Sequence, residues 1–214
     1  MKVIAFMPIK LKNERCPGKN TRLLGGKPLL QHELDSLLKT MLCDDVFVYC
    51  SSEEVVQYLP EGVKFSKRST SLDQPTTNFT QFTESFISEH DADIYVLAHA
   101  TAPFVSTETM TECINAVVSG EYDSAFCAQR IQTFLWKDGM PLNFDASNLP
   151  RTQDLEPIYQ ETSGVYVFRK EVFTSLHRRI GNKPFIKELS IKEAIDIDEE
   201  NDFHIAEAML NVKI

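Results

Sequence analysis

Residues 7–30 decide how the rest of the chain is interpreted, and they read MPIKLKNERCPGKNTRLLGGKPLL. They follow a short apolar run at residues 3–7 and lead into an amphipathic helical pattern. Between positions 10 and 19, four basic side chains stand against the single acid Glu14: Lys10, Lys12, Arg15 and Lys19. Loops that join a strand to a helix are where α/β proteins bind phosphate groups. The stretch therefore indicates an anion site, although charged loop residues are more often only solvated and neither glycine-rich phosphate fingerprint is present.

Composition and charge place the chain among ordinary globular proteins of one domain. Its 214 residues carry 22 Lys and Arg against 31 Asp and Glu, a formal net charge of −9. This balance argues against nucleic-acid binding, which needs a broad basic face, but a nucleotide substrate needs only a local patch. No apolar stretch approaches the ~20 residues of a membrane span, and the run at residues 3–7 is too short for a signal peptide. The five cysteines form no C-x-x-C pair, so we expect reduced thiols, no zinc site and a cytoplasmic protein.

Apolar periodicity predicts alternating strands and helices along the chain. Short apolar runs predict strands at residues 3–8, 46–51, 63–65, 93–98, 124–128 and 164–168. Helical spacing predicts helices at 30–41, 53–58 and 172–176, and further helices that begin near 78, 106 and 201. Strand–helix–strand units have right-handed crossovers. We therefore expect a three-layer α/β/α fold with a mainly parallel sheet and a site at the carboxyl ends of its strands.

The pattern loosens between residues 129 and 160, where glycines and prolines interrupt it. A stretch of this length without clear periodicity is uncommon inside a compact core. We expect an excursion that reaches a partner subunit, with Phe134 and Trp136 as interface anchors. A loop folded on its own domain is the alternative interpretation.

Two aspartates near the carboxyl terminus form the second candidate site. Asp196 and Asp198 alternate with Ile195 and Ile197, so in a strand both carboxylates face one side and can converge on one cation. Magnesium needs only one or two protein carboxylates when substrate phosphates and water complete its ligands. Acids in front of a helix also satisfy its N-terminal N–H groups, and that explanation suits Asp202 better.

These motifs together resemble the acylneuraminate cytidylyltransferase family, which includes the CMP-sialic acid synthetases. Residues 8–20 have the spacing of the family's N-terminal signature, and Lys19 and Asn20 match it outright. Lys10 stands where the family has Arg, and residues 11–14 replace its Gly-Gly-Ser-Lys. Residues 195–198, followed by Ala206 and Glu207, fit the C-terminal pattern in which the family's aspartates hold magnesium.

Segments in the middle of the chain fit the same family. His-Ala-Thr-Ala-Pro at 99–103 corresponds to the family's Q-P-T-S-P, so His99 takes the position of a ligand-contacting Gln and Thr101 matches. Residues 151–166 resemble the segment that helps form the acyl-sugar pocket, with Ser163 where Asn is usual. Arg68 corresponds to an Arg that helps hold the nucleotide.

The predicted site falls into groups by role. We expect the nucleotide to be bound by Lys10, Lys12, Arg15, Lys19, Asn20, Arg68 and Thr77. We expect the acceptor to be bound by His99, Thr101, Gln153, Gln160, Thr162, Ser163 and Tyr166. Asp196 and Asp198 are the expected metal ligands, and with Lys10 and Lys19 they are the expected catalytic residues.

The resemblance implies a nucleotide-diphospho-sugar transferase-like fold and a definite reaction. A cytidylyltransferase of this family couples CTP to an acidic nonulosonic sugar, giving a CMP-sugar and pyrophosphate, with Mg²⁺ as cofactor. We expect a homodimer that acts on CTP and an acidic sugar, without nucleic-acid or membrane partners. Two alternatives remain open: a glycosyltransferase-like enzyme, or a non-catalytic nucleotide-binding scaffold, which the missing loop glycines favour.

Overall fold

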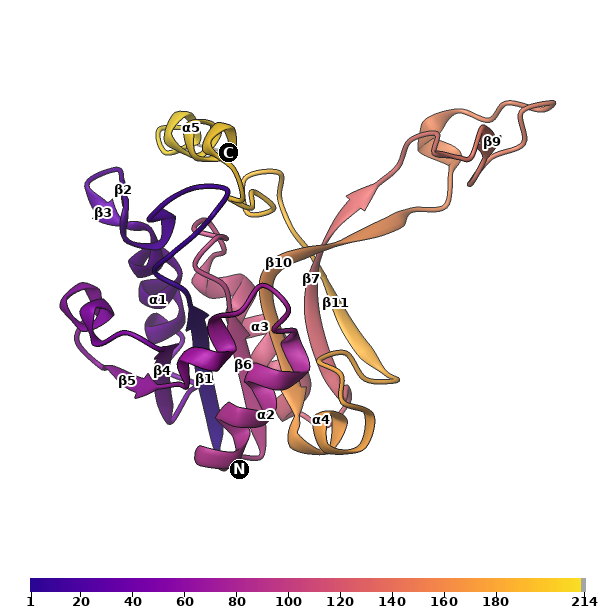
Figure 1. The fold of residues 1–214 in the computed structure, drawn as a ribbon. Coiled ribbons are helices and arrows are strands. Elements are labelled where there is room, and N and C mark those ends of the chain that lie inside the picture. The colour runs from indigo at the N-terminus through magenta and orange to yellow at the C-terminus, as the bar shows by residue number, and fades with distance from the viewer. Residues whose placement is uncertain (213–214) are drawn as a thin grey trace.

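A computed structural model describes residues 1–212 of the chain. Its centre is a seven-stranded sheet with the order β11-β7-β10-β6-β1-β4-β5, shown in Figure 1. The strands are β1 (Val3–Ile9), β4 (Asp45–Cys50), β5 (Val63–Lys67), β6 (Ile94–Ala98), β7 (Ser124–Ile131), β10 (Ile158–Arg169) and β11 (Pro184–Glu188). Two-stranded ribbons pair β2 (Leu23–Leu24) with β3 (Lys27–Pro28) and β8 (Trp136–Lys137) with β9 (Met140–Pro141).

The sheet is mainly parallel, as predicted. β1 pairs in parallel with β4 and β6, β4 pairs in parallel with β5, and β11 pairs in parallel with β7. β10 lies between β6 and β7 and runs antiparallel to both. The carboxyl ends of β1, β4 and β6 therefore meet at one edge of the sheet, where the amino end of β10 also lies.

Helices cover both faces of the sheet, which confirms the three-layer prediction. The helices are α1 (Leu29–Lys39), α2 (Phe79–Glu89), α3 (Thr107–Val118), α4 (Lys170–Leu176) and α5 (Glu200–Met209). Ala5 and Met7 of β1 pack with α1 and α3, whereas Ile4 and Phe6 pack with α2 and α4. This split follows from the alternation of side chains along a buried strand. Short 3-10 helices lie at Lys19–Thr21, Glu53–Tyr58, Thr70–Asp73 and Thr152–Asp154.

Side-chain caps fix where two of these helices begin. The Asn78 carboxamide accepts a hydrogen bond from the Gln81 N–H, and the Gln81 side chain accepts one from the Asn78 N–H. This capping box starts α2 at the predicted position. The Ser106 hydroxyl accepts a hydrogen bond from the Thr109 N–H and starts α3.

The segment expected to leave the domain forms a long arm. β7 and β10 continue past the body of the sheet, and Figure 1 shows the arm extending from their ends to the ribbon that contains β9. On the arm, the Phe144 ring packs against the rings of Phe134 and Trp136, 4.6 and 5.3 Å away between centroids. Trp136 is nevertheless 59% exposed, and Met140, Leu142 and Leu149 are exposed as well.

Two expectations about the carboxyl-terminal part were wrong or incomplete. β11 was not predicted at all. Residues 195–198 belong to no strand, because they lie past the carboxyl end of β6, where the Ile197 N–H donates to the Thr101 carbonyl at 2.8 Å. Ile197 is fully buried, whereas its neighbours Asp196 and Asp198 are half-buried.

Across residues 1–212, none of the helices combines the length and apolarity needed to cross a membrane.

Candidate functional site

A cavity of about 290 Å³ opens at the carboxyl ends of β1 and β6. Its walls come from the loop after β1, the segment before α2 and the loop after β6. Most of the predicted nucleotide-binding residues lie on it, together with two of the predicted acceptor-binding residues. The lining includes Lys10, Lys19, Asn20, Arg68, Thr77, His99 and Thr101.

Three polar atoms on the walls of this cavity are buried without a hydrogen-bond partner among the described residues. They are Asn13 Oδ1, Arg68 Nε and His99 Nε2. Buried polar groups in native proteins are nearly always paired, so orphaned ones that face a cavity point to a ligand or water as the missing partner. The Arg68 guanidinium itself is held by Asp73, with 2.6 Å between Nη2 and Oδ1.

A second cavity, of about 270 Å³, continues the first. Lys10, Asn13 and Lys19 line both, and Lys12, Arg15 and Asp198 line the second alone. The basic loop and the carboxyl-terminal segment, almost 180 residues apart in sequence, therefore form one cleft. Figure 1 shows the loop after β1 and helix α5 on the same side of the sheet, above the strand ends.

Lys19 is the direct link between the two ends of the chain. It is only 8% exposed, and its Nζ donates to the Ile197 carbonyl at 2.6 Å and to Asp198 Oδ1 at 3.1 Å. Arg15 Nη2 lies 2.9 Å from the same Asp198 oxygen. Burial by itself would raise the pKa of Asp198, but the hydrogen bonds and charges of Lys19 and Arg15 outweigh it and lower this pKa. Asp198 is therefore ionised at neutral pH.

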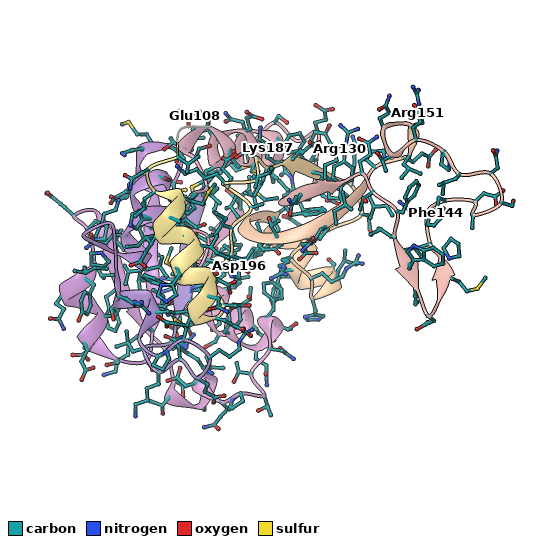
Figure 2. The ribbon with its side chains drawn as sticks, turned by 90° about the horizontal axis from the view of Figure 1, so that it is seen from above. Glu108, Arg130, Phe144, Arg151, Lys187 and Asp196 are labelled. Atoms are coloured by element: carbon teal, nitrogen blue, oxygen red, sulfur yellow. The ribbon has the colours of Figure 1, made fainter. Side chains whose placement is uncertain are left out.

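Asp196 lies in the same segment, and only one of its two carboxylate oxygens is hydrogen-bonded within the described residues. The Ser163 hydroxyl donates to Asp196 Oδ2 at 2.6 Å, whereas Oδ1 is buried without a partner among residues 1–212. Seen from above the strand ends in Figure 2, Asp196 lies between α5 and the β7–β10 hairpin. Within the described residues there is no cluster of three His, Cys, Asp or Glu side chains that could hold a metal alone. An orphaned carboxylate oxygen fits a Mg²⁺ ion whose other ligands are phosphate oxygens and water.

A bulge in β10 separates the remaining predicted acceptor residues. The pairing of β10 with β7 shifts register between Glu161 and Tyr166, and bulges commonly re-aim side chains beside functional sites. Here the bulge directs Ser163 towards Asp196. The Thr162 hydroxyl instead donates to the Cys127 carbonyl at 3.0 Å, and Tyr166 is buried with its hydroxyl on Glu161 at 2.6 Å.

Not all predicted residues come together. Gln153 is exposed in the 3-10 helix of the arm, and Gln160 is exposed on β10. Neither lines the two cavities. Both belong to the arm and its stem, so their distance from the cleft follows from the length of the β7–β10 hairpin.

His99 is a neutral side chain in this environment. Burial, with a smaller effect from the Arg179 charge, lowers the pKa of His99 to about 4. A histidine with this pKa is unprotonated at pH 7 and is a weak base there. A neutral imidazole can donate and accept hydrogen bonds, as a glutamine at the same position can.

Glu33 is a residue that sequence reasoning missed. It lies on the buried face of α1, is 0% exposed, and neither carboxylate oxygen has a hydrogen-bond partner among the described residues. Burial raises the pKa of Glu33 well above its ordinary value. The sequence did contain a signal for Glu33. This acid falls at the helical spacing of Leu30, Leu34 and Leu37, on the face of α1 that was predicted to be apolar.

Comparison with known proteins identifies the family. The family model described as cytidylyltransferase matches residues 4–213, nearly the whole chain. The chain belongs to the cytidylyltransferase family. It is 26% identical to N-acylneuraminate cytidylyltransferase A of Danio rerio, covering 89% of this chain and 46% of that protein. It is 27% identical to CMP-N,N'-diacetyllegionaminic acid synthase of Legionella pneumophila, covering 99% of this chain and 97% of that protein.

The length of the matches differs between relatives. An N-acylneuraminate cytidylyltransferase of Streptococcus agalactiae is 23% identical over 95% of this chain and 52% of its own length. This cytidylyltransferase-family chain thus spans about half the length of several curated relatives that it matches.

Solved structures bear out the fold. A CMP:2-keto-3-deoxy-manno-octonic acid synthetase complexed with CTP superposes with a TM-score of 0.72 at 16% identity, covering 98% of both chains. The 4-diphosphocytidyl-2C-methyl-D-erythritol synthase of Anaerococcus prevotii gives a TM-score of 0.68 at 14% identity, covering 99% of both chains. The predicted nucleotide-diphospho-sugar transferase-like architecture is confirmed.

Proposed function

We propose that the protein transfers a cytidylyl group from CTP to an acidic nonulosonic sugar, giving a CMP-sugar and pyrophosphate. One observation carries the proposal. The basic loop after β1 and the aspartate segment before α5 meet in one cleft, and Lys19 touches Asp198 across it. Cations for a triphosphate and the Asp198 carboxylate therefore line a cleft with orphaned polar atoms. Asp196 lines neither cavity, but it lies two residues away in the same segment and has an orphaned oxygen of its own.

The substrates are inferred from the relatives. The names of the curated relatives specify cytidylyl transfer to N-acylneuraminate or the synthesis of CMP-diacetyllegionaminate. Both acceptors are acidic nine-carbon sugars, so we infer the same substrate class here. Nothing in the cleft argues for a glycosyltransferase, because no aspartate pair follows β6, the strand that ends at Ala98.

The chain's own residues would act mainly through charge. Lys10, Lys12, Arg15 and Lys19 would neutralise the triphosphate, and cations aimed at a transferring phosphoryl group supply much of such catalysis. The anomeric oxygen of the acceptor forms a bond to the α-phosphorus, the bond from that phosphorus to the bridging oxygen breaks, and pyrophosphate leaves. The hydroxyl proton passes to solvent.

Asp196 and Asp198 would hold Mg²⁺ in this scheme. When bound, the ion orients the reactants and neutralises charge that develops on the phosphate oxygens. Ser163 fixes the Asp196 carboxylate through Oδ2 and leaves Oδ1 available. Asp198, which Lys19 and Arg15 hold in the free protein, would supply the second carboxylate for the ion.

The test is an assay of pyrophosphate release with Mg²⁺ and each of the four ribonucleoside triphosphates. The acceptors are N-acetylneuraminate, diacetyllegionaminate, pseudaminate and 3-deoxy-manno-octulosonate. The proposal predicts release with CTP and at least one of these acids, and none without acceptor. Binding of CTP without release under every acid would instead support a non-catalytic nucleotide-binding protein.

We also propose that the chain is one nucleotidyltransferase domain that forms a homodimer in the cytoplasm. The exposed apolar side chains on the arm support the dimer, because monomeric proteins rarely expose several large apolar groups together. The arm at residues 129–160 is the proposed contact between the two copies.

A further inference from the structure

A third cavity, of about 440 Å³, lies next to the cleft and was not predicted. It is lined in part by Phe79, Glu161, Arg179 and Ile180. Phe79 is the first residue of α2, and the segment just before it contributes Thr77 to the nucleotide cavity. The start of α2 therefore forms a wall between the two cavities.

The Arg179 side chain is held rigidly at this third cavity. Its guanidinium carbon lies 3.7 Å from the centre of the buried Tyr166 ring, and Nη2 donates to Glu161 Oε1 at 2.6 Å. The same Glu161 oxygen accepts from the Tyr166 hydroxyl at 2.6 Å. Stacking on an aromatic ring fixes the plane of a guanidinium and limits the entropy that it loses on binding a ligand.

Most of the hydrogen-bonding capacity of Arg179 is unused. A guanidinium carries five N–H donors, arranged so that two can bind one carboxylate in parallel. In the part of the chain that the structure describes, the bond to Glu161 is the only hydrogen bond that Arg179 makes. Its side chain is 28% exposed, so the remaining donors are accessible from the cavity.

Arg179 also lies close to the proposed reaction centre. The Tyr166 ring on which the guanidinium stacks is itself a neighbour of His99. His99 lines the nucleotide cavity, and its ring centroid is 5.7 Å from that of Tyr166. Arg179, the Tyr166 ring and His99 thus form a continuous row from the third cavity to the nucleotide cavity. In a nonulosonic acid the carboxylate is attached to the anomeric carbon, so it must lie close to the phosphate that is attacked.

We propose that Arg179 binds the carboxylate of the acidic acceptor and selects for acidic sugars. This inference rests on the proposed function for the identity of the acceptor. Glu161 holds the guanidinium in place in the free protein, and Arg179 retains enough donors to bind a second carboxylate. The site favours an anionic acceptor over a neutral sugar of the same size.

The test compares three variants of the full chain by steady-state kinetics and by calorimetric binding of each acid in the presence of CTP and Mg²⁺. Arg179→Met removes the charge and keeps the length of the side chain. Glu161→Gln keeps a hydrogen-bonding partner for Tyr166 and removes the ion pair. Lys64→Met removes an ion-paired cation on β5, at the opposite edge of the sheet.

We expect Arg179→Met to raise the KM for the acid that the wild type converts by about tenfold or more, the loss typical of a charged hydrogen bond. Its KM for CTP should match that of the wild type. Lys64→Met should keep the wild-type KM for the acid, and Glu161→Gln, which loses only the ion pair that positions Arg179, should raise this KM clearly less than Arg179→Met does. Equal increases in Arg179→Met and Glu161→Gln would overturn the proposal, because the ion pair would then be structural.

The outcomes separate this inference from the proposed function. Pyrophosphate release with an unchanged acceptor KM in Arg179→Met would overturn the role of Arg179 and leave cytidylyl transfer intact. If the wild type binds an acid without turnover, binding of that acid by Arg179→Met decides the inference in the same way. A wild-type protein that neither binds nor converts any of the four acids overturns both.

Discussion

Lys19 is the residue on which the geometry of the cleft depends. Its ammonium group is almost buried, and it bridges the Ile197 carbonyl and the Asp198 carboxylate. A buried cation is stable only when its donors are paired. In the free protein, these hydrogen bonds fix the position of the carboxyl-terminal segment relative to the loop after β1. In the proposed complex, the same positive charge faces the triphosphate.

Replacing Lys19 should reduce turnover sharply. Lys19→Met should lower kcat/KM for CTP by about 100-fold or more, because one of the groups that stabilise charge on the phosphates is lost. Pyrophosphate release gives the measurement. Lys39→Met, at an exposed position in the last turn of α1, is the matched control and should behave as wild type. Near-normal kcat/KM in Lys19→Met would show that the buried lysine is structural.

Glu33 should make stability depend on pH in an unusual direction. Its pKa is raised in the folded protein, so ionisation of Glu33 adds no cost to folding below about pH 4.5, where the side chain is protonated in both the folded and the unfolded state. Above that pH the unfolded state loses the proton first, and stability falls by at most about 1.4 kcal/mol per pH unit until the folded pKa is reached.

Glu33→Gln removes this titration. The variant should be more stable than wild type at neutral pH, by a margin that grows as the pH rises from about 5 until the pKa of the folded protein is reached. Urea unfolding across this range measures the margin, with the exposed Glu84→Gln as control. A difference between Glu33→Gln and wild type that does not change with pH would exclude an elevated pKa at this position.

At the scale of elements, α5 fastens the aspartate segment onto the basic loop. Phe203 of α5 is fully buried with Cys16, Leu24 and Leu29. Arg22 lies 3.9 Å above the Phe203 ring and forms an ion pair with Glu200, with 2.5 Å between Nη1 and Oε1. The position of Asp198 relative to Lys19 therefore depends on how α5 packs.

Truncating Phe203 should loosen this attachment. Phe203→Ala should lower the free energy of unfolding by about 3–5 kcal/mol, the usual cost of emptying a buried aromatic site. Activity should also fall at temperatures where the variant is still folded. Ile205 lies on the same helix and is 53% exposed, so Ile205→Ala should lower the free energy of unfolding by no more than about 0.5 kcal/mol. Equal losses in the two variants in urea unfolding would show that α5 is not anchored through Phe203.

The elements that could be predicted are those whose periodicity and capping residues lie within the element itself. α2 was predicted from its phenylalanine stripe and its asparagine cap, and both act within one segment. The first half of β10, beginning at Ile158, was missed because it forms the stem of the arm, where its side chains are polar and exposed. β11 was missed because this edge strand begins with Pro184 and contains only two apolar residues, Phe185 and Ile186.

The residues of the site that were predicted differ from those that were missed in the same respect. The charge of the basic loop and the spacing of Asp196 and Asp198 can be read locally, so these residues were predicted. The contact of Ser163 with Asp196 and the stacking of Arg179 on Tyr166 join separate elements. Such contacts depend on the bulge in β10 and on the loop after α4, which no local pattern indicates.

Across the molecule as a whole, the arm is the segment that exposes several large apolar side chains, among them Trp136 and Leu142. Trp136 and Leu142 should anchor the dimer, because large side chains in the centre of an interface carry most of the binding energy. Trp136→Asp should raise the dimer dissociation constant by about 30-fold or more. Multi-angle light scattering across a dilution series gives the measurement, with the exposed Met41→Asp as control. A wild-type protein that is monomeric at high concentration would contradict the proposed dimer.

Asp196→Asn is the variant that decides whether the two ends of the chain converge to form a metal-dependent transfer site. Asparagine keeps the size of the side chain and a carbonyl oxygen for Ser163 but removes the negative charge. We predict that kcat for pyrophosphate release at saturating CTP and Mg²⁺ falls by about 100-fold or more, while the free energy of unfolding changes little. Full activity in Asp196→Asn would show that this carboxylate holds no metal ion needed for the transfer.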